Sequence, residues 1–384
     1  MINKKQKKSK GKNGGVWRKI YRTTLILFTL IVATCLIIAS YGGNASPSIY
    51  RNLCIMVMTF PIWGLSMIAI TILDAIWCRK ALIICAITFA ICATALWEFS
   101  PLNIFSPSEK VYADCPKFTL LTYNVANFSS MDGNYPEGQN PTISYILRSG
   151  ADVVCIQEST GISAKSKTVV ISPEQIDSLN KVYPYILLYG HSQMLLSKYP
   201  ASPIPLGTAK KSGNEIALFR LDIEGLPITI ANVHLQSYSL STEDKSLYYD
   251  LTRMNANETE IKKNIEGARY QLLSKIRNAA EGRATDTDRL MGYIRRFGGP
   301  NVIVAGDFND VPGCYTLRQL EELEMQQVYP EVGLGPMITF NDNRFYFRID
   351  HVLYRGKLKP LSLSSSDHKS SDHNPLLTTF AITN

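Results

Sequence analysis

The sequence predicts an α/β domain that follows three membrane-spanning helices. Three long uncharged apolar runs occupy residues 23–99, and short apolar strands alternate with helical segments over residues 116–384. Several of these strands are joined as hairpins, which favours two mixed sheets that pack face to face with helices outside. Of the 384 residues, 46% are hydrophobic and 19% are charged, a composition that argues against a disordered or coiled-coil protein.

The three apolar runs predict three transmembrane helices. Residues 25–41 are almost continuously apolar, residues 53–73 carry no charge, and residues 81–97 are uncharged over 17 positions. A helix needs about 20 apolar residues to cross the hydrocarbon core, so the third run is at the short end of this range. Buried core helices are the alternative, but three such runs in succession favour membrane spans.

Basic residues set the expected orientation. Residues 1–22 hold nine Lys and Arg and no acid, and Arg79-Lys80 separate the second run from the third. The positive-inside rule places both groups in the cytoplasm, so three crossings put the rest of the chain on the periplasmic side of the inner membrane. A cleaved signal peptide is the alternative for the first run. The long basic stretch and the lack of a small-x-small cleavage site disfavour it.

These patterns divide the chain into four parts. We expect a basic cytoplasmic tail (1–22), a three-span anchor (23–99), a linker rich in Pro and Ser (100–115) and one α/β domain (116–384). The formal charge of +8 resides mainly in the tail, because residues 111–384 hold 27 basic and 29 acidic residues. This near-neutral body disfavours a protein that coats nucleic acid.

The elements of the domain follow from local patterns. The segment Ser172-Pro173-Glu174-Gln175 predicts a helix start in which Ser caps the helix and Gln reaches back. Helical patterns also occupy 142–148 and 257–297, the latter with a break at 282–286. Apolar or alternating segments predict strands at 118–125, 152–157, 185–188, 193–198, 215–223, 227–235, 301–305, 348–354 and 375–382.

Polar side chains directly follow five of these strands. They are Asn124 in LLTYNVANF, Glu158 in VVCIQES, His234 in ITIANVHL, Asp307 and Asn309 in VIVAGDFND, and Asp372-His373 in SSDHNP. Any one alone is weak, since a lone Asn is usually a turn former and a lone His a structural residue. Together they should emerge at one edge of the sheet pair, on rigid support, and they predict a catalytic site.

These residue types suit the hydrolysis of a phosphate ester. Carboxylate and amide oxygens are the hard ligands that Mg²⁺ prefers, with Mn²⁺ as a possible substitute. One imidazole can help to take a proton from water, and a second can donate to the phosphate or the leaving group. The eight cysteines show no paired spacing, and a Gly-rich P-loop is absent, so zinc and nucleotide-driven transfer are not indicated.

The order Asn, Glu, His, Asp-x-Asn, Asp, Asp-His resembles the endonuclease/exonuclease/phosphatase superfamily in a membrane-anchored bacterial form. That superfamily includes deoxyribonuclease I, exonuclease III and the neutral sphingomyelinases. The resemblance covers roughly residues 116–381 and implies a four-layer α/β sandwich. It also implies a magnesium-dependent phosphoesterase, which includes phosphodiesterases, phosphatases and nucleases.

The resemblance further implies roles for individual residues. Glu158, Asn124 and Asp372 are the expected metal ligands. His234 is expected to contact the phosphate, and Asp307 with Asn309 to orient the nucleophile. His373, paired with Asp372, is the expected general base or phosphate ligand, with Asp350 as a supporting carboxylate. Outside the family pattern, Arg269 in the long segment 236–300 is a candidate phosphate clamp, although a surface ion pair is the favoured interpretation. His351 is expected to be structural, and His191 and His368 to lie at the surface.

Two classes of function fit these residues. The first is an anchored phosphoester hydrolase, and the second is a non-catalytic binding or scaffold module on the same fold. The complete set of residues favours the enzyme. Among substrates, a lipid headgroup or a small phosphate ester is favoured over a nucleic acid, because the body is near neutral and the domain is held at a bilayer. No protein partner is evident.

Overall fold

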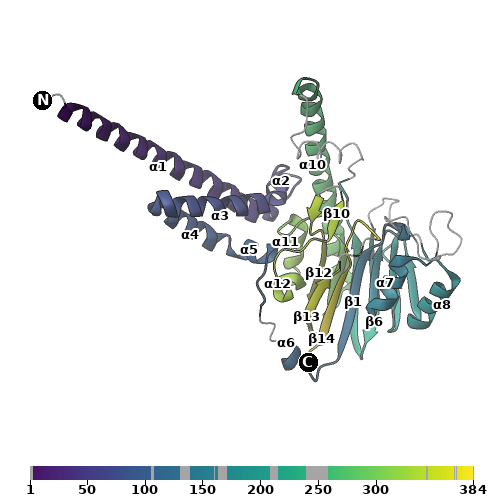
Figure 1. Ribbon diagram of the computed structural model, residues 1–384. Coiled ribbons are helices and arrows are strands. Elements are labelled where there is room, and N and C mark those ends of the chain that lie inside the picture. The colour runs from purple at the N-terminus through teal and green to yellow at the C-terminus, as the bar shows by residue number, and fades with distance from the viewer. Residues whose placement is uncertain are drawn as a thin grey trace.

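The computed structural model describes residues 3–104, 108–129, 139–159, 161–162, 171–207, 215–238, 258–342, 345–366, 368 and 370–383. Within these ranges, only the backbone is described for residues 3–14, 108–109, 258–269 and 345. The described strands form two six-stranded sheets and a separate two-stranded hairpin. Figure 1 shows the two large sheets packed together, with helices α1, α3 and α4 projecting to one side.

The two large sheets are mixed. In chain order their strands are β1 (Lys117–Asn124), β2 (Val153–Gln157), β3 (Tyr185–Tyr189), β4 (Gln193–Ser197), β5 (Ala201–Ile204), β6 (Glu215–Ile223), β7 (Leu226–His234), β8 (Val302–Asp307), β9 (Gln326–Gln327), β12 (Asp350–Arg355), β13 (Leu358–Ser365) and β14 (Leu376–Ile382). The first sheet has the order β13-β14-β1-β2-β4-β3, and the second has the order β5-β6-β7-β8-β12-β9. Strands β1 and β2 are parallel, as are β7 and β8.

Strand β8 illustrates how the sequence builds this core. All six of its residues are buried, as expected for a fully apolar central strand. Side chains alternate along a strand, so Ile303 and Ala305 join the core between the sheets. Val302 and Val304 point to the other face, where they pack with helix residues such as Leu290.

Helices cover the outer faces of both sheets. Helices α7 (Pro141–Ser149) and α8 (Pro173–Val182) pack on the first sheet through Ile143, Ile146 and Leu179. Helices α10 (Glu258–Phe297) and α11 (Tyr315–Glu321) pack on the second sheet. The domain is therefore layered α/β/β/α, and the predicted α/β sandwich is confirmed.

Local helix signals are confirmed at one position and wrong at another. The capping box of α8 forms as predicted, with Ser172 and Gln175 bonding to each other's backbone. The predicted break at 282–286 is absent, because α10 runs unbroken through it. Gly282 lies against Gln236 so closely that a Cβ would come within 2.9 Å of that side chain. Here the glycine allows close packing and does not end the helix.

The prediction of three membrane-spanning helices needs correction. Two segments are long and apolar enough to cross a membrane, Gly15–Asn44, which includes most of α1 (Asn3–Tyr41), and α3 (Phe60–Trp77). The third run forms two short helices, α4 (Leu82–Ile91) and α5 (Ala93–Phe99), which meet at a bend of 62°. A third crossing exists only if this bent pair acts as one span.

Contacts with the domain explain the direction of α5. The indole of Trp97 donates to the carbonyl of Pro330 at 2.8 Å, and the carboxylate of Glu98 pairs with Arg318 at 2.6 Å. The guanidinium of Arg348 also donates to the backbone carbonyl of Glu98. These bonds hold α5 against the domain, so it cannot continue the axis of α4.

Other parts of the N-terminal region also contact the domain. Gly43 lies so close to Gly313 that a Cβ there would meet the Gly313 carbonyl at 1.9 Å. After α5, Leu102 forms a β-bridge with Leu334. The described start of the predicted linker, residues 100–104, therefore lies against the domain.

Candidate active site

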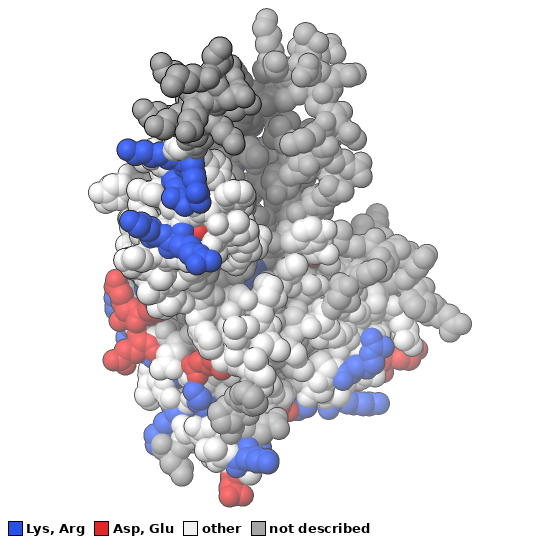
Figure 2. All heavy atoms as spheres, turned by 60° about the vertical axis from the view of Figure 1, so that its left-hand side comes forward, with Lys and Arg blue, Asp and Glu red and all other residues white. Residues whose placement is uncertain are grey.

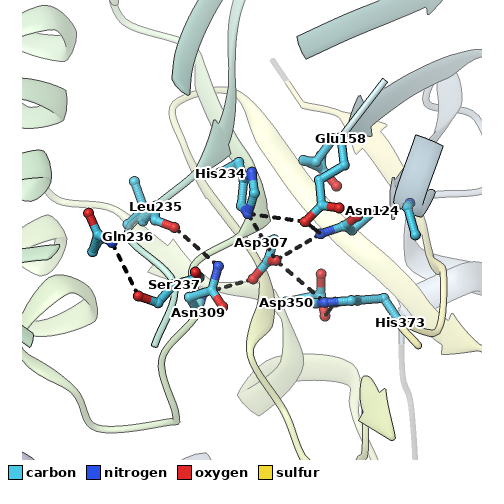
Figure 3. A network of polar contacts seen from close by, with 12 residues as sticks. Asn124, Glu158, His234, Leu235, Gln236, Ser237, Asp307, Asn309, Asp350 and His373 are labelled. Atoms are coloured by element: carbon cyan, nitrogen blue, oxygen red, sulfur yellow. Dashed lines mark hydrogen bonds and ion pairs between the residues drawn. The ribbon is translucent and has the colours of Figure 1, made fainter. Parts of the chain in front are cut away.

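The predicted site residues meet at one edge of the sheet pair (Figure 3). Parallel pairing brings the carboxyl ends of β1 and β2 together, with Asn124 beside Gln157 and Glu158 next along the chain. The same pairing sets His234 of β7 opposite Asp307 of β8. Asn124, His234 and Asp307 end buried strands, whereas Asp350 begins β12 and Asp372-His373 come just before β14. Because β12 and β14 run antiparallel to β8 and β1, their starts lie at the same edge.

Asp307 is the centre of the cluster. Its Oδ2 accepts a hydrogen bond from Nδ2 of Asn124 at 3.0 Å and lies 3.6 Å from Nε2 of His234 and 3.5 Å from Nε2 of His373. Its Oδ1 accepts from the backbone N–H of Asn309 at 2.8 Å. Both imidazoles therefore converge on a single buried carboxylate.

His373 and Asp350 form a buried pair, with Nδ1 of the imidazole 2.9 Å from Oδ2 of the carboxylate. Burial by itself would lower the pKa of His373, but the carboxylates of Asp350 and Asp307 outweigh it and raise this pKa to about 10. Burial raises the pKa of Asp350, although the nearby His373 opposes the shift. At neutral pH the pair is an imidazolium and a carboxylate, with Nε2 of His373 close to Asp307.

Glu158, His234 and Asp307 form a group that could hold a metal ion. One ligand atom from each lies within 4.8 Å of the other two. The two carboxylates supply the oxygen ligands that Mg²⁺ and Mn²⁺ prefer, and the group contains no thiolate. Glu158 has a positive φ of 54°, which is uncommon for Glu and is concentrated at functional sites. The donor set therefore fits the predicted divalent metal.

Two predicted metal ligands are placed differently from this group. Asn124 directs its Nδ2 to both Glu158 and Asp307, each at 3.0 Å, and its Oδ1 accepts from the backbone of Ala126. As placed, the amide holds the two carboxylates together. Asp372 lines the same cavity but belongs to neither close group of potential ligands in the described chain. The second such group is Asp307, Asp350 and His373.

Two other predicted side chains are Asn309 and Arg269. Nδ2 of Asn309 donates to the carbonyl of Leu235 at 3.1 Å, which fixes its amide beside Asp307. Arg269 falls within α10, but its side chain lies outside the described residues.

The remaining histidines are not among the residues that line the cavity. His351 is buried with Nε2 2.9 Å from the carbonyl of Asp310, and burial lowers its pKa to about 3, as a structural residue requires. His191 is exposed, as expected. His368 is half-buried and stacks on Tyr145, with ring centroids 4.7 Å apart, so its expected surface position is only partly correct.

Two buried polar groups beside the site were not predicted. Arg283 of α10 pairs with Asp310 at 2.9 Å and donates to the carbonyl of Gln236 at 2.9 Å. It thereby ties the segment after His234 to the segment after Asn309. These partners lie 27 and 47 positions away in the chain, so no local sequence pattern predicts the two contacts.

The second group links the two sheets beneath the site. Nε2 of Gln157 donates to Oδ1 of Asn232 at 2.6 Å, across from the first sheet to the second. The amide of Asn232 in turn donates to the carbonyls of Ile156 and Met194. The sequence offered one indication of this link, because Gln157 and Asn232 are polar residues near the ends of otherwise apolar strands.

Comparison with known proteins decides the family. The profile of the Endonuclease/Exonuclease/phosphatase family matches residues 121–373, which include all of the site residues described above. The chain belongs to this family. The resemblance inferred from the strand-end motifs is therefore confirmed. As its name indicates, the endonuclease/exonuclease/phosphatase family consists of enzymes that hydrolyse phosphate esters.

Individual relatives of this endonuclease/exonuclease/phosphatase chain match only part of it or have low sequence identity. A UPF0294 protein of Vibrio cholerae is 40% identical over 100 residues, which are 25% of this chain and 32% of the relative. The match thus spans about a third of the length of that protein.

Among solved structures, an endonuclease/exonuclease/phosphatase from Beutenbergia cavernae has a TM-score of 0.45 and 16% identity, covering 70% of this chain and 72% of that one. The human Nocturnin catalytic domain with a bound sulfate anion has a TM-score of 0.44 and 15% identity, covering 70% and 96% of the two chains.

Proposed function

We propose that this protein is a membrane-anchored, metal-dependent phosphoester hydrolase. In this proposal residues 23–99 are the anchor and residues 116–384 are the catalytic domain. The observation that carries it is the convergence of His234, His373 and Glu158 around the carboxylate of Asp307. A scaffold module would have no need for two imidazoles and two carboxylates held together at a cavity of about 630 Å³.

The geometry supports a division of labour among these residues. Glu158, His234 and Asp307 would hold Mg²⁺ or Mn²⁺, which when bound neutralises charge on the phosphate oxygens. His373 is charged at neutral pH, so it suits a hydrogen bond to a phosphate oxygen better than a role as general base. Asp307, held in position by the backbone N–H of Asn309, would orient the attacking water beside the metal.

Chelation of divalent metal should abolish the activity. We expect the full-length protein in detergent to hydrolyse bis(p-nitrophenyl) phosphate or p-nitrophenyl phosphate with Mg²⁺, to lose this activity in EDTA, and to regain it with excess Mg²⁺. Release of p-nitrophenol measures all three states. Activity that persists in EDTA would contradict the metal dependence. Failure to hydrolyse any ester in a panel of mono- and diesters would favour the scaffold alternative.

Charge supports a lipid headgroup or small phosphate ester over a long duplex. Figure 2 shows one face of the molecule, on which both signs of charge are interspersed over the domain and basic side chains gather near the N-terminal end of α1. Exposed Arg22 donates to the carbonyl of Trp77, which lies close in the chain to Arg79 and Lys80. A protein that holds a duplex must neutralise several phosphates, and the domain has no net positive charge for this.

The same basic residues support an extracytoplasmic domain. Arg22 and the Arg79-Lys80 turn lie at the end of the anchor away from the contacts with the domain, as the positive-inside rule requires. Alkaline phosphatase fused after the C-terminal residue should therefore be active, and β-galactosidase at the same position should be silent. The opposite result would mean that the bent pair α4–α5 does not cross the membrane.

A further inference from the structure

The cavity at the active site has a polar end and an apolar remainder. Glu158, His234, Asp307, Asp372 and His373 form the polar end. No Lys or Arg is among its described lining residues, and most of the others are apolar. A long polyanion would need basic side chains along its path, whereas a hydrocarbon chain needs this kind of surface.

The N-terminal helices supply one side of this apolar surface. Ile55 and Met58 of α2 (Leu53–Met58) and Pro61 and Ile62 of α3 line the cavity. Leu272 and Ile276 of α10 also contribute. The cavity is thus closed jointly by the segment expected to lie in the membrane and by the catalytic domain.

This joint surface is built into the structure. Val57 is buried in a small apolar cluster with Val311 and Ile349 of the domain. The hydroxyl of Tyr238 lies 3.6 Å from the sulfur of Met58, which lines the cavity. Arg51, just before α2, donates to Oδ1 of Asn278 at 2.7 Å. Helix α2 therefore has a defined position beside the catalytic residues.

The cavity also adjoins the surface that α3 offers to lipid. Ile62 lines the cavity and is 60% exposed, and Leu65, one turn further along the same helix, is 69% exposed. Helix α3 is one of the two helices that are long and apolar enough to span a membrane. A chain leaving the cavity past Ile62 would enter the hydrocarbon region without crossing water.

We propose that the substrate is a membrane lipid phosphoester, with its phosphate at Asp307 and His373 and the first part of its hydrocarbon chain in the cavity beside α2 and α3. This inference rests on the proposed hydrolase function. In it, the anchor forms part of the substrate site as well as holding the enzyme at the membrane. A small soluble ester would leave the apolar part of the cavity unfilled.

The test is a series of p-nitrophenyl alkyl phosphates with chains from one to twelve carbons. Full-length protein in nanodiscs is assayed below the critical micelle concentration of each ester. We expect kcat/KM to rise with chain length by up to about fourfold for each methylene that enters the cavity. The rise should stop once the cavity is filled. The soluble diester bis(p-nitrophenyl) phosphate reports on the catalytic residues independently of the chain.

A matched pair of variants locates the effect. Met58→Gln makes the cavity surface polar with little change of shape and should flatten the dependence on chain length. Met56→Gln alters the same helix at a position that is not among the residues lining the cavity. It should leave the dependence on chain length intact and keep hydrolysis of the soluble diester within twofold of wild type. Equal flattening in both variants would overturn the assignment of the chain to this surface.

Two outcomes in the wild type separate the two proposals. If the soluble diester is hydrolysed and kcat/KM does not change with chain length, the lipid inference is wrong and the hydrolase function stands. If neither the soluble diester nor any member of the series is hydrolysed with Mg²⁺, the hydrolase function itself fails, and the inference fails with it.

Discussion

Replacing His373 by alanine should lower the turnover of a soluble phosphodiester by roughly 10²–10⁴-fold, the usual value of a positioned proton donor or acceptor. The imidazole lies 3.5 Å from Asp307 and is held charged by Asp350, so its loss removes a charged donor from a water-poor site. Steady-state kinetics with saturating Mg²⁺ measure the effect on kcat.

Two further histidine variants test whether this loss is specific. His191→Ala removes an exposed imidazole that is not among the residues lining the cavity and should change kcat by less than about twofold. His234→Ala should also cost roughly 10²–10⁴-fold. Because both active-site imidazoles serve one reaction, the double variant of His234 and His373 should lose less than the product of the single losses. A His373→Ala enzyme that keeps a tenth of its activity would contradict the assignment.

Asp350→Asn should move the alkaline limb of the pH–rate profile to lower pH. The carboxylate of Asp350 raises the pKa of His373, so the imidazolium persists to higher pH in the wild type. Without this carboxylate the imidazole loses its proton at lower pH, and activity that needs the charged form is lost sooner. The dependence of kcat/KM on pH measures the pKa values of the essential groups in the free enzyme. An unchanged alkaline limb would mean that Asp350 has only a structural role.

Glu158→Gln should weaken the binding of divalent metal by at least about 100-fold, since removal of an outer-sphere partner alone typically costs 10–100-fold. Glu158 contributes one of the three ligand atoms that lie within 4.8 Å of one another. The neutral amide keeps the size of the side chain and removes its charge. Titration with Mn²⁺, followed by electron paramagnetic resonance on the full-length protein, measures affinity without reference to activity.

Glu174→Gln is the matched control for the metal experiment. Glu174 is an exposed carboxylate in the first turn of α8, outside the cavity, and its replacement should leave Mn²⁺ affinity unchanged. If Glu158→Gln binds Mn²⁺ as well as the wild type does, the metal is held elsewhere or not at all. A parallel loss in both variants would indicate general unfolding, which circular dichroism would detect.

Local patterns were sufficient wherever a structure depends on neighbouring residues. The apolar run at 302–305 is a central strand because both of its faces are buried, and Ser172 caps α8 because its partner is three residues away. The site residues were predictable for a related reason. Most of them lie at the end of a buried strand, so strand pairing brings residues such as His234 and Asp307 together.

The tertiary structure decided the features that depend on distant partners. The bend between α4 and α5 accompanies bonds from Trp97 and Glu98 to residues more than 200 positions away. The pairing of Arg283 with Asp310 and the closure of the cavity by Met58 likewise join segments that no sequence period relates. The sequence by itself determined most strands and helices of the domain and the residue types of the site, since these follow from local burial and hydrogen bonding. Only packing determined that the N-terminal helices border the active site, because it depends on how two separately formed surfaces fit together.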